Sequence, residues 1–541
     1  MATGERDRVA EQTQGATTER STSRGLSAIA VAITLLVLSP LAWLVMRASE
    51  METARAFELV TSQTTVDVTV NTIVLVSTVT VLAVLVGVPL AILTVQTDLP
   101  FRRFWTVTSA LPLVVPSYIG AFAFVSAFGP HGHLSNLFAP FGIEQIPEIY
   151  GLPGAALVLT LFTYPYVFLT TRAALLSFDG TMVEAARSLN HTRWQAFRRV
   201  TLPQIAPGIA GGSLLVALYT LGDFGTPSIM KYDVFTRMIF NEFGAQRIDY
   251  AAVLSWLLLG MAVVILAVES RIEAGRDGAY VSRGARRPGE IQLGRWKVPA
   301  LLFCGGIATL GLALPIGILL HWLARGGVGF SQAGRPFEIA FAWNSVSVAA
   351  AAAAVSVVVA LPLAYLAARS DTRLSSLPDR LSYVGYAVPG VVLGLALVYL
   401  SLRFLPFVYN SAILLVFAYV VRFMPQAVGT TKSSLLQIDP SYVEAARSLG
   451  YAPLSAFRKV VLPLVAPGIA AGGALVFLTT MKELPATLML RPLGFETFVT
   501  YIWRVQESGY YGQAAIPALV LVLVSGLSMV VILRRENYDA T

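Results

Sequence analysis

Two acidic residues, Asp223 and Glu483, each closely follow a long apolar stretch of this 541-residue chain. They correspond to one another when the sequence is shifted by 260 positions. Carboxylate oxygens are suitable ligands for hard cations. We therefore predict that the two carboxylates contact a solute near the outer end of a pathway. The alternative is that they lie at hydrated helix ends, where Lys482 balances the charge of Glu483.

Few other residues could support chemistry. His131 and His133 form an H-x-H pair, but two ligands are too few for a defined metal site, which favours a solvated loop. The single cysteine, Cys304, lies in an apolar run, where we expect it to pack. The chain contains no G-x-x-x-x-G-K-[ST] phosphate loop, no H-E-x-x-H and no G-x-S-x-G. We therefore expect no enzyme, and no cofactor held by this chain.

The composition is that of a membrane protein. Hydrophobic residues make up 55% and charged residues 13% of the chain, with a mean hydropathy of +0.68, whereas soluble domains carry about 25% charged residues. Apolar stretches of about 20 residues, the length that crosses a bilayer, recur throughout. The predicted spans are 25–47, 68–95, 105–128, 152–174, 204–224, 250–270, 298–323, 342–368, 381–404, 410–431, 464–484 and 514–533.

The basic residues indicate how these spans are oriented. With the N-terminus inside the cell, 27 of the 39 Lys and Arg residues lie in cytoplasmic segments and 11 in external ones, with Arg422 inside a span. The largest cluster lies between the sixth and seventh spans, and we interpret it as a topology signal rather than a nucleic-acid or lipid site. Both termini are predicted to be cytoplasmic, with a disordered polar tail over 1–24 and a short tail over 534–541.

An internal repeat organises the spans. One set of residues, Asn71, Pro89 and Pro116, recurs 273 positions later as Asn344, Pro362 and Pro389, and the block 171–212 recurs 260 positions later. Six spans separate equivalent points, so the two copies have the same orientation in the membrane. We predict an all-α polytopic membrane protein of two parallel six-helix halves, 25–270 and 298–533, joined by a basic cytoplasmic linker over 271–297.

The most similar parts of the two halves are polar loops on the predicted cytoplasmic side. Each begins with a predicted capping box, Thr181 with Glu184 and Ser441 with Glu444. An apolar stripe follows, and Asn190 or Gly450 then ends the helix, since Asn tolerates a left-handed backbone better than most residues do. The shared residues are Glu184, Ala185, Ala186, Arg187, Leu189, Asn190, Leu202 and Pro203, and Glu444, Ala445, Ala446, Arg447, Leu449, Gly450, Leu462 and Pro463.

This repeated motif resembles the EAA loop of ATP-binding-cassette importer permeases of the type I, MetI-like fold. The second copy matches fully, and the first has Asn190 where the family usually has Gly. The resemblance implies a non-enzymatic permease in a prokaryotic cell membrane. It also implies two ATPase subunits, which carry ATP and Mg and bind one loop each, and an external solute-binding protein. The remaining implied partner is membrane lipid, and nucleic acid is not expected to bind.

The segments after the fifth and eleventh spans, 221–237 and 482–495, resemble ferric-iron permeases of this superfamily. Iron(III) is a hard cation, which fits the two carboxylates. A thiamine, polyamine or aminophosphonate permease of the same architecture remains the alternative. A secondary transporter is more distant, because it would need ionisable residues deep in the spans.

Overall fold

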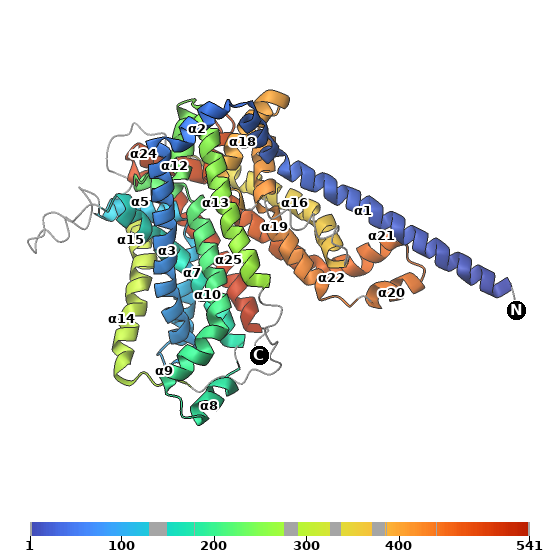
Figure 1. Ribbon diagram of the computed structural model, residues 1–541, viewed down its shortest axis with the longest axis horizontal. Helices are drawn as coiled ribbons and strands as arrows, with labels where there is room; N and C mark the ends of the chain where they lie inside the picture. Colours follow the sequence, from blue (N-terminus) through green and yellow to red (C-terminus); the bar gives the residue numbers. More distant parts are fainter. Residues whose placement is uncertain are drawn as a thin grey trace, which may run out of the picture. The chain divides into compact units, whose positions relative to one another are not determined.

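Figure 1 shows the computed structural model, which describes residues 3–128, 149–177, 179–274, 290–324, 337–369, 385, 387–439 and 441–538. Within these residues, nine helices are long and apolar enough to cross a membrane. A further span is bent by 95° between Val114 and Ser117, and two shorter apolar helices are Gly390–Phe404 and Tyr511–Gly526. In chain order these segments correspond one to one to the twelve predicted spans. The prediction of an all-α polytopic membrane protein is confirmed.

The helices form two compact units, and each unit contains helices from both halves of the sequence. The larger unit comprises Arg47–Ala342, Pro389–Val392 and Glu496–Thr541, and the smaller comprises Met1–Met46, Trp343–Val388 and Leu393–Phe495.

The larger unit holds most of the first half. Its helices up to the linker are α2 (Thr53–Thr61), α3 (Gln63–Gln96), α4 (Arg102–Ala110), η1 (Leu111–Val114), α5 (Ser117–Phe128), α7 (Gly151–Ser177), α8 (Thr181–Ser188), α9 (Arg193–Ala196), η3 (Phe197–Thr201), α10 (Leu202–Gly222), α11 (Gly225–Ile229), α12 (Phe235–Gly244) and α13 (Ile248–Ala274). Later helices that join it are η4 (Gly294–Trp296), α14 (Lys297–Ala308), η5 (Thr309–Ala313), α15 (Leu314–Ala324), α24 (Phe498–Glu507), η7 (Tyr511–Ala514) and α25 (Ala515–Tyr538).

The smaller unit holds the middle of the second half together with the first helix of the chain. Its helices are α1 (Thr3–Glu50), α16 (Ile339–Arg369), α18 (Gly390–Phe404), α19 (Ala412–Leu436), α20 (Ser441–Ser448), α21 (Pro453–Ala456), η6 (Phe457–Val461), α22 (Leu462–Met481) and α23 (Pro485–Leu490). Helices α1, α16 and α18 extend a few residues beyond the unit boundary.

Close helix packing is repeated in the two units. In the larger unit α3, α7 and α10 pack side by side, and in the smaller unit α19 packs on α22 (Figure 1). A Cβ atom at Gly212 would lie 2.7 Å from Val167 Cα, and one at Gly472 would lie 2.9 Å from Ala427 Cα. Only glycine allows this approach, as is typical of helix pairs in membranes. The rigid pairs α7–α10 and α19–α22 are therefore equivalent elements of the repeat.

The halves exchange helices. In the larger unit the Trp322 indole of α15 donates to Ser126 of α5 over 2.8 Å, and the Tyr511 ring lies 5.2 Å from that of Phe122. In the smaller unit Trp43 of α1 stacks on Tyr399 of α18 at 5.1 Å. The first helix of each half thus packs on the core of the other half.

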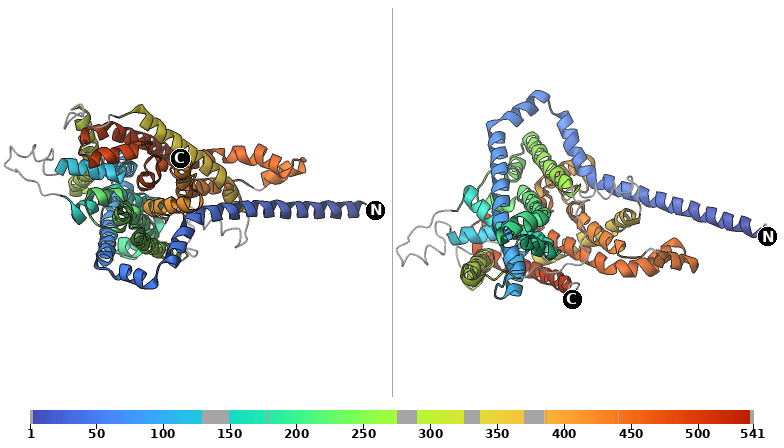
Figure 2. Two further views of the ribbon diagram at one scale, coloured as in Figure 1. Left: turned by 90° about the horizontal axis from the view of Figure 1, so that it is seen from above. Right: turned by 60° about the horizontal axis from the view of Figure 1, so that its bottom comes forward.

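The N-terminal tail differs from its prediction. Helix α1 begins at Thr3, and Figure 2 shows it as one continuous rod, whereas the sequence suggested disorder over 1–24. The tail is polar and contains many Thr and Ser residues, but it extends a helix that is already formed, so it avoids the cost of nucleation. Cys304 is buried and unpaired, as expected.

Candidate functional site

The first candidate site is a bent segment at the end of α10, which we call the first elbow (residues 181–203). Helix α8 ends where Asn190 adopts a left-handed backbone with φ of +63°. The N–H groups of Asn190 and His191 donate to the carbonyls of Arg187 and Ala186 over 3.1 and 3.3 Å. This is the Schellman arrangement that closes a helix. Helix α9 and the π-turn η3 then lead into α10 at Leu202.

The second elbow (residues 441–463) repeats this geometry in the smaller unit. Gly450 is left-handed with φ of +84°, and Tyr451 N–H donates to Ala446 carbonyl over 3.2 Å. A π-turn, η6, again leads into the long helix, here α22 at Leu462. The prediction that Asn190 can take the place of glycine in this turn is confirmed.

The predicted cap of the first elbow is wrong. Helix α8 has no side-chain cap, and Thr181 N–H instead donates to Asp179 Oδ1 over 3.0 Å. The second elbow has the equivalent contact, Ser441 N–H to Asp439 Oδ1 at 2.9 Å, and this bond lowers the pKa of the Asp439 carboxyl. In both elbows the carboxylate that accepts from the first helical N–H group belongs to an Asp two residues before it, outside the helix. Glu184 and Glu444 are therefore left exposed.

A true capping box exists one helix later. Thr192 and Gln195 at the start of α9 satisfy one another's backbone N–H groups over 3.2 and 3.0 Å. The second elbow has Pro453 at the same point, which suits a first helical turn. The T-x-x-Q spacing is a recognised sequence signal for a helix start, and the sequence analysis missed it.

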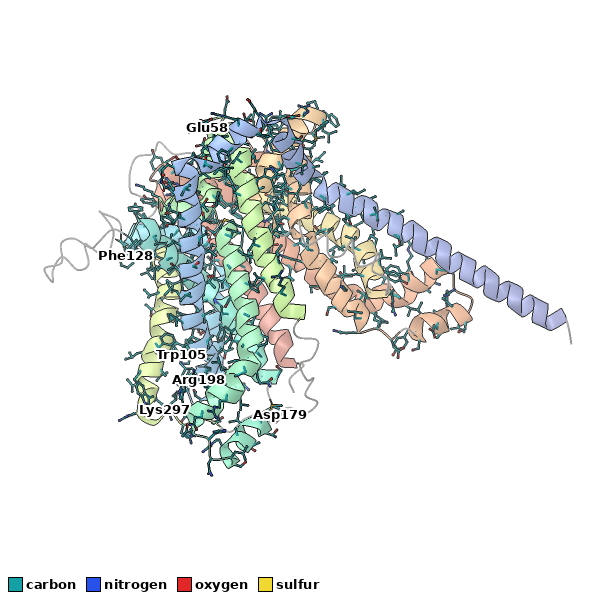
Figure 3. All side chains as sticks on the ribbon, viewed as in Figure 1. Glu58, Trp105, Phe128, Asp179, Arg198 and Lys297 are labelled. Atoms are coloured by element: carbon teal, nitrogen blue, oxygen red, sulfur yellow. The ribbon has the colours of Figure 1, made fainter. Side chains whose placement is uncertain are left out.

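Both elbows expose apolar side chains. Of the predicted stripe only Ala186 and Ala446 are buried, while Leu189 and Leu449 are 74% and 79% exposed. The next large apolar residues, Trp194 and Leu454, are exposed as well. Figure 3 shows Asp179, just before the first elbow, and Arg198, within it, at one end of the larger unit, with Glu58 at the other end. Each elbow thus presents an apolar and basic surface that its own unit leaves uncovered.

The first predicted pathway residue, Asp223, lies at the opposite end of α10 from the first elbow. Its carboxylate accepts hydrogen bonds from the Ser117 hydroxyl and, over 2.9 Å, from Thr226 N–H at the start of α11. The hydroxyl of Tyr219 donates to Ser117 over 3.3 Å. A single 21-residue helix, about 30 Å long, therefore connects the elbow to this carboxylate.

Glu483 occupies the equivalent turn after α22. Its Oε1 atom accepts from Ala486 N–H over 3.3 Å, as Asp223 does from Thr226, and lies 3.2 Å from Arg422 Nη1. The ion pair is largely buried, with side-chain exposures of 7% for Glu483 and 18% for Arg422. In the alternative to a solute contact the sequence offered Lys482 as the counter-charge of Glu483, and the structure pairs Glu483 with Arg422. Arg422 could have been found as a charge inside an apolar span.

No metal centre accompanies these carboxylates. The residues that the structure describes contain no group of three His, Cys, Asp or Glu side chains able to hold a metal ion. His131 and His133 lie outside the described residues.

The geometry defines a class of protein. In this duplicated helical membrane protein, each of the long helices α10 and α22 has an exposed elbow at one end and a carboxylate turn at the other. The chain belongs to the family described as binding-protein-dependent transport system inner membrane component, which it matches twice, over residues 80–272 and 360–536. It is therefore a multi-pass membrane permease of an ATP-binding-cassette importer, and two repeats are confirmed.

Named relatives agree with this family. The chain is 31% identical to the Fe(3+)-transport system permease protein FbpB 2 of Haemophilus influenzae, over 79% of this chain and 81% of the relative. It is 25% identical to the ferric transport system permease protein FbpB of Actinobacillus pleuropneumoniae, over 81% and 66% respectively. The sulfate transport system permease protein CysT of Escherichia coli is 27% identical over 43% of this chain and 86% of its own length.

Proposed function

We propose that this chain forms the pathway for iron(III) in an importer driven by two ATPase subunits. The single observation that carries the proposal is the mechanical connection in each unit: an uncovered elbow and a carboxylate turn are the two ends of one spanning helix, α10 or α22. A force applied to the elbow is transmitted to the turn, because the helix is held rigidly against α7 or α19 by the glycine contacts.

The elbows would each receive one ATPase subunit. Exposed Leu189 and Leu449 offer apolar anchors for a groove, and the neighbouring Arg187 and Arg198, with their counterparts, add positive charge. The motif residues from Glu184 to Pro203 and from Glu444 to Pro463 are the proposed coupling sites. ATP and Mg would bind to the partner subunits, since the chain has no phosphate loop.

Iron(III) as the solute rests on the names of the relatives that match over most of this chain. The carboxylates of Asp223 and Glu483 are hard oxygen ligands that suit such an ion. We infer that they lie near the external entrance, where a solute-binding protein delivers the ion. The elbows and both termini would then be cytoplasmic in a bacterial inner membrane, with the halves 25–270 and 298–533 joined by the linker 271–297.

The test is transport by the purified chain reconstituted with its ATPase and its solute-binding protein. Iron(III) on the binding protein should stimulate ATP hydrolysis and enter the vesicles, whereas thiamine, a polyamine, an aminophosphonate or sulfate should not. Charge reversal of both Glu184 and Glu444 should abolish uptake and ATPase association while membrane levels stay normal. Uptake that survives this double change would refute the coupling role, and stimulation by another solute would refute iron.

Arg55→Gln is a suitable control for the elbow variants. Arg55 is an exposed residue of α2, paired with Glu58 at 2.9 Å, and lies outside both elbows. Exposed ion pairs of this kind contribute little to stability. The control should therefore keep wild-type uptake.

A further inference from the structure

The end of the linker lies against the short connection between α3 and α4 in the larger unit. Ile291 N–H donates to Gln96 carbonyl over 2.8 Å, and Asp98 N–H donates to Ile291 carbonyl over 3.2 Å. Leu293 N–H adds a bond of 2.8 Å to the Asp98 carboxylate. The backbone of the linker is thus fixed to a segment far away in the sequence.

Two ion pairs hold the same segments together. Lys297 Nζ lies 2.8 Å from Asp98 Oδ2, and Arg102 Nη2 lies 2.5 Å from Glu290 Oε1. The hydrogen bond from Lys297 lowers the pKa of the Asp98 carboxyl. These contacts hold the start of α4 against the start of α14, so that the two helix starts form one continuous surface.

Around these fixed contacts is a set of exposed side chains, which we call the basic-aromatic patch. It consists of Phe101, Arg103, Phe104, Arg295 and Trp296, all of them exposed. Within the part of the chain that the structure describes, Arg103 and Arg295 have no carboxylate within ion-pair distance. Arg102 and Lys297 therefore hold the two segments together, whereas Arg103 and Arg295 remain available to a ligand.

Phe101 is held in an unfavourable conformation. Its φ is +59°, in the left-handed region, and its side chain is 78% exposed. A bulky residue there costs about 1–2 kcal/mol, and nothing in its own unit covers the ring in return. Such an outlier points to a function for the exposed ring.

The location of the patch indicates what it meets. Helices α4 and α14 each begin an apolar span, so the patch lies where two spans leave the hydrocarbon region. Figure 3 shows Trp105 and Lys297, which border the patch, at the same end of the larger unit. Aromatic rings are enriched at this depth, and arginine there faces the lipid headgroups.

Although the basic cluster of the linker as a whole is interpreted as a topology signal, we propose that its Arg295, together with the rest of the basic-aromatic patch, binds the headgroup of an anionic phospholipid. The guanidinium groups of Arg103 and Arg295 donate to the phosphate, a pairing whose planar geometry favours two parallel hydrogen bonds. The rings of Phe101, Phe104 and Trp296 insert between neighbouring headgroups. Because the linker supplies half of the site, bound lipid also holds the two segments together.

Native mass spectrometry of the full chain in detergent tests this site. Phosphatidylglycerol is added in one arm, phosphatidylcholine in a second, and phosphatidylglycerol with excess inorganic phosphate in a third. We expect one retained phosphatidylglycerol and no retained phosphatidylcholine. The R103Q/R295Q double variant should bind phosphatidylglycerol more weakly, by about fivefold for each charge removed.

Two further variants keep the test decisive. R55Q/R237Q removes the same number of positive charges at two residues outside the patch, each paired with a carboxylate of its own helix or the preceding turn, and should bind as the wild type does. F101G relieves the left-handed strain, so it should unfold at the same or a higher temperature while it binds phosphatidylglycerol more weakly. Equal retention by R103Q/R295Q and wild type would overturn the proposal. Displacement of bound phosphatidylglycerol by inorganic phosphate would also overturn it. So would an R103Q/R295Q variant that still binds phosphatidylglycerol but no longer associates with the ATPase.

Discussion

The two ends of the spanning helices α10 and α22 have diverged to different extents. At the elbow ends the two copies share the left-handed turn, its closing hydrogen bonds and the buried alanines, and they differ in Asn190 against Gly450 and in the start of the next short helix, where a capping box is replaced by Pro453. At the other ends the backbone contact is kept, but Asp223 meets the Ser117 hydroxyl while Glu483 meets the Arg422 guanidinium. The two ATPase subunits that we propose would require two similar surfaces, whereas a single solute requires no symmetry. The contrast supports coupling at one end and passage at the other.

Among the changes that test this comparison, removal of the Arg422 charge should have the largest effect, and the effect should be on the free energy of unfolding. Arg422→Met leaves the buried Glu483 carboxylate without its cation and should lower the free energy of unfolding by about 3 kcal/mol. The Arg422→Met/Glu483→Gln double variant should recover most of that loss, because no unpaired charge remains. Denaturant unfolding in detergent micelles measures both. Additive losses in the double variant would show that the pair is not coupled.

Asp223→Asn should act on transport more than on stability. Asparagine keeps an oxygen for Thr226 N–H but removes the charge that attracts a cation, so iron(III) uptake should fall about tenfold, equivalent to ~1.4 kcal/mol. Initial uptake rates in vesicles provide the measurement. If Asp223→Asn and Glu483→Gln both transported normally at normal membrane levels, neither carboxylate would belong to the pathway.

Exchange of the elbow turn residues should have a smaller effect. Gly450→Asn places a side chain on a left-handed backbone and should cost about 0.5 kcal/mol, while Asn190→Gly should be neutral or slightly stabilising. A Cβ atom at Gly450 meets nothing within 4 Å, so strain alone is measured. Thermal unfolding of the single and double variants checks this. A large loss of ATPase coupling in Asn190→Gly would instead show that the elbows are functionally distinct.

The smallest expected effect is a pH response of the cap at the second elbow. The bond from Ser441 N–H lowers the pKa of Asp439 below its usual value, so this cap is present at neutral pH. Its contribution is lost as the pH falls below about 4 and the carboxyl is protonated. Hydrogen exchange of the Ser441 amide should accelerate in that range. Asp439→Asn should remove the pH dependence.

The sequence predicted the parts of the fold that depend on local patterns. The twelve apolar segments follow from hydropathy, and the two elbows follow from a repeated motif whose left-handed turn needs Asn or Gly at 190 and 450. The cap at Asp179 was missed because Ser, Thr and Asp compete for the same role within a few residues. Helicity over residues 3–24 was missed because polar composition reports on the absence of a core rather than on backbone conformation.

Contacts between distant segments could not be predicted from one sequence. Arg422 and Glu483 are brought together by the packing of α19 on α22, and Ile291 bonds to Gln96, which lies far away in the sequence. Neither pairing leaves a periodic or local signal. Lys482 is the nearest cation in sequence and was therefore named as the counter-charge of Glu483 in the alternative interpretation, whereas packing pairs Glu483 with Arg422.

The exchange of first helices between the halves limits how the gene can have evolved. Trp322 of the second half donates a hydrogen bond to Ser126 of the first, and Trp43 of the first half stacks on Tyr399 of the second. A substitution at one of these positions therefore favours a compensating substitution at its contact in the other half. A chimera that joins the first half of this chain to the second half of a distant relative would therefore mismatch at both crossings. Divergence must proceed by paired substitutions, and a fused reading frame ensures that the matched partners are inherited together.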